Sequence, residues 1–426
     1  MFFGGRGDNA SGQRGHAPAL HLHCQVGRPR MAVSPAGQLA YVLATVQATD
    51  AIQAVRFPLN FCFVLDTSGS MNGKKIEAVR AAVSMLVEQM LPDDMVSVVS
   101  FSGNGKVVVP AQPVRNKQAI QHLVGGLHSG GGTQMARGMA LGLEELQKFH
   151  SPQVVTRMVL LTDGKTSNKG KCLELADRAR ILAMPIHPMG VGSEWNEKLL
   201  DEVGNRSRGQ PAEFIRAPAD ALAVFQQQFQ SAAAVAVRNA TLTLDLPMGV
   251  TPRRVMKTLP LISDLGQSGL SDRRVLVPLG DIERDIPQAV LVELMVIAQR
   301  PGGFRLAHLE VTYDVPNRGY FNETVSTDAI VEYVADGAQA QAVNADVMNI
   351  AEKASAHRLV TRALDEYRET GKVTTRLAPS VLANLDPETQ AALSQLTEGQ
   401  ASGSTAETMV KEISQKTRRL TQRLDR

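Results

Sequence analysis

The chain has 426 residues, too many for one ordinary hydrophobic core, and this length predicts two or three domains. Its 45 basic and 42 acidic residues are well mixed and give a formal net charge of +3, so charge alone indicates neither a nucleic acid nor an anionic membrane as partner. No stretch reaches the roughly 18 apolar residues of a membrane span, and the first residues lack the apolar core of a signal peptide.

The cysteines predict a reducing compartment. Cys24, Cys62 and Cys172 are an odd number and lie far apart in the sequence, which argues against a disulfide framework. We therefore expect a cytoplasmic protein that does not insert into a membrane.

The N-terminal part predicts a tail followed by strands. Residues 1–17 are rich in Gly, Asn, Ser and Gln and predict a flexible tail. Two apolar stretches, 20–26 and 39–48, have the composition of β-strands. We expect residues 18–57 to supply these strands to a β-sandwich that is completed later in the chain.

Residues 58–232 predict a doubly wound α/β domain. Short, continuously apolar runs are typical of parallel strands buried on both faces, and they occur at 61–65, 95–101, 157–162 and 186–192. Between the first two runs, apolar residues recur at helical spacing: Ile76, Val79, Val83, Leu86 and Met90. Further helices are expected over 134–149, 171–184, 196–204 and 219–232. Strands and helices in alternation indicate a mostly parallel sheet covered by helices.

The helical period ends near residue 233 and β runs follow. They lie at 240–246, 273–279, 289–298, 305–313 and 323–334, separated by Pro, Gly and Asp. Five strands here and two before residue 50 nearly complete an antiparallel sandwich, so we predict that the α/β domain is inserted into a β-sandwich covering 233–337 and the earlier strands.

Residues 338–426 predict a helical C-terminal region. Helical stretches at 342–367 and 387–396 precede a Gly- and Ser-rich segment, 399–405, that has the composition of a linker. The last helix places apolar residues and a threonine at spacings of three and four: Val410, Ile413, Thr417, Leu420 and Leu424. An apolar stripe this short fits either a helix that packs against its own chain or a helix that associates with a second copy of the protein.

Three loops place oxygen donors at one edge of the predicted sheet. Asp66, Ser68 and Ser70 follow the first buried strand, Thr133 precedes a helix, and Asp163 follows a later strand. Ligands of doubly wound sheets bind beyond the carboxyl ends of the strands, where these loops meet. Carboxylate and hydroxyl oxygens suit a hard divalent cation, and so few carboxylates favour Mg²⁺ over Ca²⁺. Helix N-termini after Gly73 and Thr133 also favour an anionic ligand here.

The same residues carry a family resemblance. "DTSGS" at 66–70, "GGT" at 131–133 and "LTDG" at 161–164 resemble, in order and position, the metal-ion-dependent adhesion site of the von Willebrand factor type A domain. The resemblance covers about 170 residues, and all five ligand positions match. The flanking sandwich is also similar, in architecture alone, to integrin β chains and to proteins resembling calcium-activated chloride channels.

The resemblance implies a metal ligand set and a type of partner. It implies that Ser68 and Ser70 coordinate Mg²⁺ or Mn²⁺ directly, that Asp66 and Asp163 act through waters, and that Thr133 binds directly or indirectly. An Asp or Glu carboxylate of a partner protein would complete the metal's coordination, and the last helix of the domain, about 219–232, would shift.

Other interpretations of these residues remain open or fail on the sequence. "DTSGSM" also fits a simple turn that leads into a helix. A phosphate loop fails, because "GSMNGKK" has the wrong spacing and "DGKT" has Val159 in place of the first glycine. A Ser nucleophile would need a nearby His, and His128, His150 and His187 are scattered, but metal-assisted hydrolysis of phosphoesters stays open.

The sequence therefore predicts a non-enzymatic, metal-dependent protein-protein interaction module of a scaffold or adaptor, for example in signalling. The resemblance implies an AAA+ ATPase, or a kinase or phosphatase assembly, as partner candidates. A Mg²⁺-dependent phosphoester hydrolase and a regulatory subunit of a transport or ATPase complex are the alternatives.

Overall fold

The computed structural model describes residues 17–52, 56–266, 270–271, 273–298 and 300–425. The chain forms two compact units. One contains residues 56–235 and 401–415, and the other contains the flanking segments up to 55, 236–400 and 416–426. The flexible tail predicted for residues 1–17 lies outside the described residues except for its last position.

The first unit is built on a six-stranded sheet with the order β6-β5-β4-β7-β8-β9. All neighbouring strands are parallel except β6, which is antiparallel to β5. The central strands are continuously buried, as their apolar runs predict. The strands are β4 (Leu59–Asp66), β5 (Met95–Phe101), β6 (Gly105–Pro113), β7 (Val155–Thr162), β8 (Ile186–Val191) and β9 (Glu213–Ile215).

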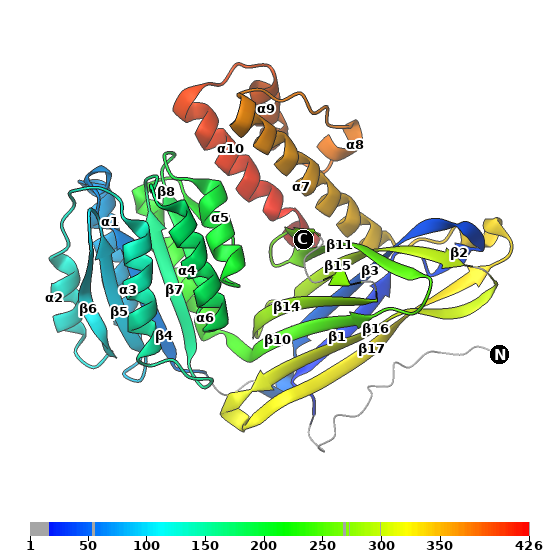
Figure 1. Ribbon diagram of the computed structural model, residues 1–426, viewed down its shortest axis with the longest axis horizontal. Coiled ribbons are helices and arrows are strands. Elements are labelled where there is room, and N and C mark those ends of the chain that lie inside the picture. Colours follow the sequence, from blue (N-terminus) through cyan, green and yellow to red (C-terminus); the bar gives the residue numbers. More distant parts are fainter. Residues whose placement is uncertain (1–16, 53–55, 267–269, 272, 299, 426) are drawn as a thin grey trace. The chain divides into compact units, whose positions relative to one another are not determined.

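Helices cover both faces of this sheet (Figure 1). Alternate side chains of β4 enter two separate cores: Phe61 and Phe63 pack with α1, α2 and α6, whereas Cys62 and Val64 pack with α3, α4 and α5. The helices are α1 (Lys74–Gln89), α2 (Lys117–Gly125), α3 (Met135–Gln147), α4 (Lys169–Ile181), α5 (Glu197–Arg206) and α6 (Ala221–Ala233). These elements confirm the predicted doubly wound α/β fold.

The second unit contains two antiparallel-rich sheets, with the orders β1-β3-β15-β11-β12 and β13-β14-β10-β16-β17-β2. Strands from before and after the α/β segment share both sheets, as the prediction of an inserted domain requires. The strands are β1 (Leu20–Val26), β2 (Arg30–Ala32), β3 (Ser34–Ala48), β10 (Val235–Asp245), β11 (Val250–Leu259), β12 (Ser263–Gly266), β13 (Leu270–Ser271), β14 (Arg274–Glu283), β15 (Gln288–Ala298), β16 (Gly302–Val315) and β17 (Tyr320–Val334).

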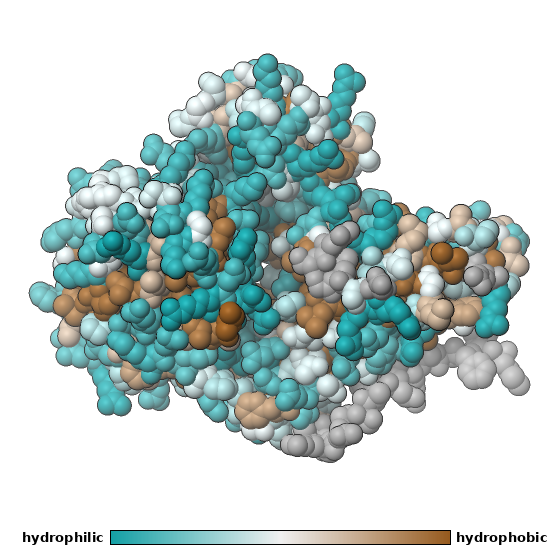
Figure 2. All heavy atoms as spheres, viewed as in Figure 1, coloured by the Kyte–Doolittle hydropathy of each residue, from teal (hydrophilic) through white to brown (hydrophobic). Residues whose placement is uncertain are grey.

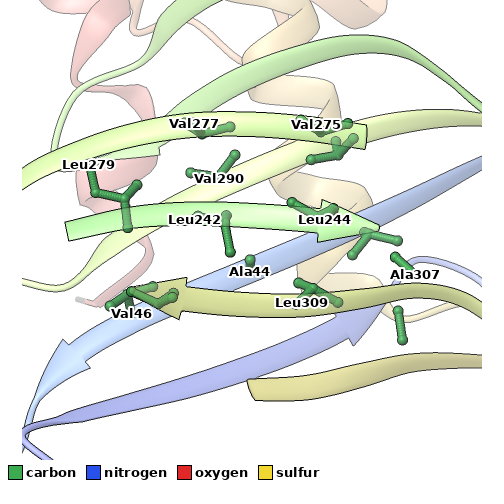
Figure 3. Close-up of a cluster of buried hydrophobic side chains, with 14 of the residues drawn as sticks. Ala44, Val46, Leu242, Leu244, Val275, Val277, Leu279, Val290, Ala307 and Leu309 are labelled. Atoms are coloured by element: carbon green, nitrogen blue, oxygen red, sulfur yellow. The ribbon is translucent and has the colours of Figure 1, made fainter. Parts of the chain in front are cut away.

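The two sheets bury one common core. Leu242 and Leu309 of one sheet and Ala44 and Val290 of the other belong to the same cluster of buried side chains (Figure 3). Polar residues alternate with these apolar ones along β10 and β14, which is the pattern of strands buried on one face only.

Helices complete the chain. Helix α7 (Ala345–Thr370) packs Val347, Ile350 and Ala354 against side chains of β3, β11 and β15, such as Leu291. The remaining helices are α8 (Pro379–Leu382), α9 (Pro387–Thr397) and α10 (Gly403–Arg418). Short 3-10 turns lie at Asp50–Ile52, Gly69–Met71, Pro218–Asp220, Pro316–Arg318, Gly337–Ala340 and Leu420–Asp425. Across the described residues, every helix is too short or too polar to span a lipid bilayer.

Some expected boundaries differ from the structure. The predicted linker 399–405 is wrong in its second half, because α10 begins at Gly403 and Ala401 is already buried. The last helix ends at Arg418 and is followed by a 3-10 turn, so the expected apolar stripe of this helix ends before Leu420. Val410, Ile413 and Leu420 are buried within the chain, and self-association through this helix stays a prediction.

Candidate functional site

The candidate site lies where the connections that follow β4 and β7 run to helices on opposite faces of the sheet, α1 and α4. Strand β4 pairs with β5 on one side and with β7 on the other, and Asp66 and Thr162 are the last residues of β4 and β7. Such a reversal of strand order opens a crevice at the carboxyl ends of the strands. The loops that carry Asp66, Ser68, Ser70, Thr133 and Asp163 all start or end at this edge.

Asp66 is fully buried and both of its carboxylate oxygens accept hydrogen bonds. Ser68 N donates to Oδ1 over 2.8 Å, and Thr162 Oγ1 donates to Oδ2 over 2.6 Å. Burial raises the pKa of Asp66, the hydrogen bonds from Thr162 and Ser68 lower it, and the nearby Asp163 charge raises it again. Asp66 is thus fixed by hydrogen bonds in a buried place where a positive charge would stabilise its ionised form.

A chain of hydroxyl groups links Asp66's loop to Asp163. The Ser68 and Ser70 hydroxyl oxygens are 3.1 Å apart, and Ser70 Oγ donates to Asp163 Oδ1 over 2.7 Å. Asp163 is buried, with 1% of its surface exposed, whereas Ser70 is exposed. The structure therefore brings Asp66, Ser68, Ser70 and Asp163 together as one cluster that is open to solvent at Ser70.

The simple-turn interpretation accounts for only part of this cluster. Asp66 does accept a hydrogen bond from the backbone two residues later, as turn-forming aspartates do. However, the N-cap of α1 is Gly73, and neither serine hydroxyl caps a helix. The serine hydroxyls face each other and Asp163 instead, which a turn does not require.

Thr133 lies beside the cluster, where contacts between the loops hold it. Thr166 Oγ1 donates to the Thr133 carbonyl over 3.1 Å, and a Cβ on Gly164 would lie 3.7 Å from Thr133 Oγ1. Gly69 N also donates to the carbonyl of Gly131 over 3.2 Å. Gly131 needs to be glycine, because its φ is +84° and a side chain there would come within 3.2 Å of the backbone of the β5–β6 turn.

Two residues that the sequence did not single out contribute to the cluster. Thr162 holds Asp66, and it lies within the "LTDG" motif, which was the available signal. Lys75, in the first turn of α1, places its Nζ 2.5 Å from Asp163 Oδ2, and about a third of its side chain is exposed. Nothing in the sequence distinguishes this lysine from its neighbour Lys74.

The donor set fits a hard cation. All five predicted residues offer oxygen, and an ammonium group, that of Lys75, already faces one of the two carboxylates. In the described part of the chain, no three His, Cys, Asp or Glu side chains group together as a metal site. This cluster has only two carboxylates, so a metal here would depend on hydroxyl groups, water and an external ligand.

Comparisons with known proteins identify the domain. Residues 60–228 match the model of the von Willebrand factor type A domain. An uncharacterised protein of Synechocystis sp., sll0103, is 33% identical over 275 residues, which cover 63% of this chain and 64% of that protein. Inter-alpha-trypsin inhibitor heavy chain H3 of Homo sapiens is 29% identical over 165 residues, 36% of this chain and 18% of that protein. The chain thus spans less than two thirds of these relatives.

Solved structures match the fold of nearly the whole chain. A von Willebrand factor type A protein from Catenulispora acidiphila superposes with a TM-score of 0.77 at 17% identity, over 95% of this chain and 98% of that one. The ArnB paralog VWA2 from Sulfolobus acidocaldarius has a TM-score of 0.55 at 15% identity, with 95% and 99% covered. Residues 60–228 therefore form a von Willebrand factor type A domain within a larger fold that other proteins share.

Proposed function

We propose that this von Willebrand factor type A domain binds a partner protein through a Mg²⁺ or Mn²⁺ ion held by Asp66, Ser68, Ser70, Thr133 and Asp163. The observation that carries the proposal is the hydrogen-bonded chain from Asp66 through the two serines to Asp163. A bound divalent cation would supply a Lewis-acidic position that attracts an Asp or Glu carboxylate from outside.

The arrangement favours binding over catalysis. Among the described residues, the hydroxyl groups of Ser68 and Ser70 are hydrogen bonded to each other and to Asp163, and none of these bonds involves a histidine. His187 is buried in β8, and burial followed by the charge of Arg157 lowers its pKa well below the usual range. We therefore propose a non-enzymatic role, which turnover assays with phosphoesters and nucleotides in Mg²⁺ or Mn²⁺ test. Turnover that Asp66→Asn abolishes would overturn this choice.

The metal step is tested by calorimetric titration of the purified protein with Mg²⁺ and Mn²⁺. We expect the substitutions Asp66→Asn and Asp163→Asn, which keep the side-chain shape, to weaken metal binding by about 10- to 100-fold. Asp93→Asn is the matched control, because Asp93 is exposed in the loop before β5, at the opposite edge of the sheet. A wild-type protein that binds neither ion at millimolar concentration would refute the proposal.

The partner step is tested by affinity capture with and without EDTA, followed by mass spectrometry. We expect partners that are lost in chelator, lost with Asp66→Asn and Asp163→Asn, and kept with Asp93→Asn. Capture that is equal in all of these conditions would contradict a metal bridge. The scaffold role and the AAA+ ATPase, kinase and phosphatase candidates stay predictions that this experiment also tests.

A further inference from the structure

The loops around the candidate site are strongly basic. Four segments surround the candidate site at this edge of the sheet: 66–75, 102–106, 126–137 and 163–171. Apart from Asp66 and Asp163, their charged side chains are all positive: Lys74, Lys75, Lys106, Arg137, Lys165, Lys169 and Lys171. Seven positive and two negative charges give these segments a formal charge of +5, whereas the whole chain carries only +3.

We call these seven side chains the basic rim. Structural contacts tie its segments to the cluster. Lys75 contacts Asp163, and Arg137 donates to Asn104 Oδ1 over 2.6 Å in the turn between β5 and β6. Lys106 pairs with Ser100 at the start of β6, next to that turn. Lys165 lies two residues after Asp163.

Most of the basic rim is available to a ligand. Lys74, Lys106, Lys165 and Lys169 are exposed, and within the described residues none of them forms an ion pair. Lys171 pairs with the exposed Glu174 of its own helix, over 2.7 Å. Exposed pairs of this kind contribute little to stability, so the charges of these five lysines contribute little to holding the domain together.

The opposite edge of the same sheet carries less positive charge. Its connections contain Arg56, Arg115, Lys148 and Arg208 together with the carboxylates Asp93 and Asp94, and four positive and two negative charges give a formal charge of +2. Exposed carboxylates also lie close to the rim segments in the sequence: Glu77 in the first turn of α1 and Glu174 in α4. Positive charge is therefore more concentrated around the candidate site than at the opposite edge.

We propose that the basic rim recognises an acidic segment of a partner protein, in which one carboxylate binds the metal and neighbouring carboxylates face the rim lysines. This rests on the proposed metal-dependent function and specifies its partner. Surface lysines arranged around one binding point raise the rate of association with acidic ligands and select against basic ones.

A protein segment fits better than a nucleic acid. The four rim segments contain no Phe, Tyr or Trp, the side chains on which unpaired bases stack. Hydrophilic residues make up most of the face that Figure 2 shows, and hydrophobic residues lie in separate groups between them. Because the four rim segments lack aromatic side chains, we expect recognition at this edge to come from charge and from the metal.

The test uses two synthetic peptides that share a central Asp, one flanked by Glu residues and the other by Gln residues. Binding in Mg²⁺ or Mn²⁺ is measured by fluorescence anisotropy at several salt concentrations. We expect the Glu-flanked peptide to bind about tenfold more tightly at low salt and to lose most of this advantage at high salt. A labelled single-stranded oligonucleotide of equal charge is the competing probe, and its tighter, metal-independent binding would overturn the choice of a protein segment.

Paired variants identify the charges responsible. Lys165→Gln with Lys169→Gln removes two rim charges, and Arg115→Gln with Arg178→Gln removes two exposed charges away from the rim, after β6 and in the second half of α4. We expect only the first pair to reduce the preference for Glu flanks, because five rim charges remain, with the Mg²⁺ affinity unchanged within about twofold. Metal-dependent binding without any preference for Glu would overturn the acidic-segment proposal alone. Failure of metal binding would instead overturn the proposed function.

Discussion

Lys75 stands where a cation would bind, so its removal is expected to strengthen metal binding. Its Nζ lies 2.5 Å from Asp163 Oδ2, and a divalent ion that uses this carboxylate must share it with the ammonium group or displace it. The substitution Lys75→Met keeps the apolar part of the side chain and removes the charge. The variant then binds metal without first breaking an ion pair.

The magnitude follows from the exposure of the pair. Asp163 is buried, but about a third of the Lys75 side chain reaches solvent, so the pair is worth about 1 kcal/mol after solvent screening. At room temperature this corresponds to roughly a fivefold lower Kd for Mg²⁺. Lys74→Met is the matched control, because it removes the same charge from an exposed neighbour. At physiological salt we expect this control to change the Kd by less than about twofold.

The assay is calorimetric titration with Mg²⁺ and Mn²⁺, together with thermal unfolding in EDTA and in excess metal. Without metal, Lys75→Met leaves the buried Asp163 carboxylate with less compensation, so the variant should unfold at a lower temperature and gain more from metal than the wild type. A Kd that is unchanged relative to Lys74→Met, or weaker, would refute the reasoning. It would show that Lys75 positions Asp163 for the metal instead of competing with it.

Three further predictions concern stability, measured by chemical denaturation. Gly190→Ala would place Cβ 2.0 Å from the buried Trp195 ring and should destabilise by about 1–3 kcal/mol or more, whereas Gly170→Ala in α4 meets no atom within 4 Å and should stabilise by about 0.5–1 kcal/mol. The Nζ of Lys411 lies 4.5 Å from the centre of the Trp195 ring, and Lys411→Met removes this cation–π contact. The substitution should lower the free energy of unfolding by about 1–2 kcal/mol. Burial, followed by the charge of Arg418, lowers the pKa of His357 to about 3. The unfolded chain therefore binds a proton near pH 6.5 that the folded protein does not bind, and the free energy of unfolding falls as the pH drops from about 6.5 towards 3. His357→Gln should reduce the loss of stability between pH 7 and pH 5 by about 2 kcal/mol, and an unchanged pH profile would contradict this.

The sequence predicted the parts of the site that depend on strand ends. Asp66 and Asp163 follow continuously apolar runs, and the carboxyl ends of parallel strands necessarily meet at one edge, so their proximity could be expected. Metal binding by these residues stays a prediction. Thr133 was harder to place, because its position depends on contacts that glycines allow, such as the close approach of Gly131 to the β5–β6 turn.

Other features could not be predicted, because they depend on side-chain direction or on weak sequence patterns. Lys74 and Lys75 are adjacent in sequence, and only the orientation of α1 decides which one reaches Asp163. Strand β11 was missed because Pro252 and two arginines interrupt its apolar pattern. The contacts of α10 with the α/β unit, including Lys411 on Trp195, join residues that are far apart in the sequence.

Formal charges explain why binding at this site should depend on metal. Without metal, Asp66 and Asp163 outweigh Lys75 by one negative charge, and a partner carboxylate would be repelled from the centre of the cluster. A divalent ion changes the net charge of these groups from one negative to one positive. The metal and the surrounding lysines then both attract an acidic partner. The rim alone would attract acidic segments weakly and without a fixed position. Metal and rim together would orient one carboxylate on the ion, so we expect the preference for Glu-flanked peptides to be largest when metal is bound and small in EDTA.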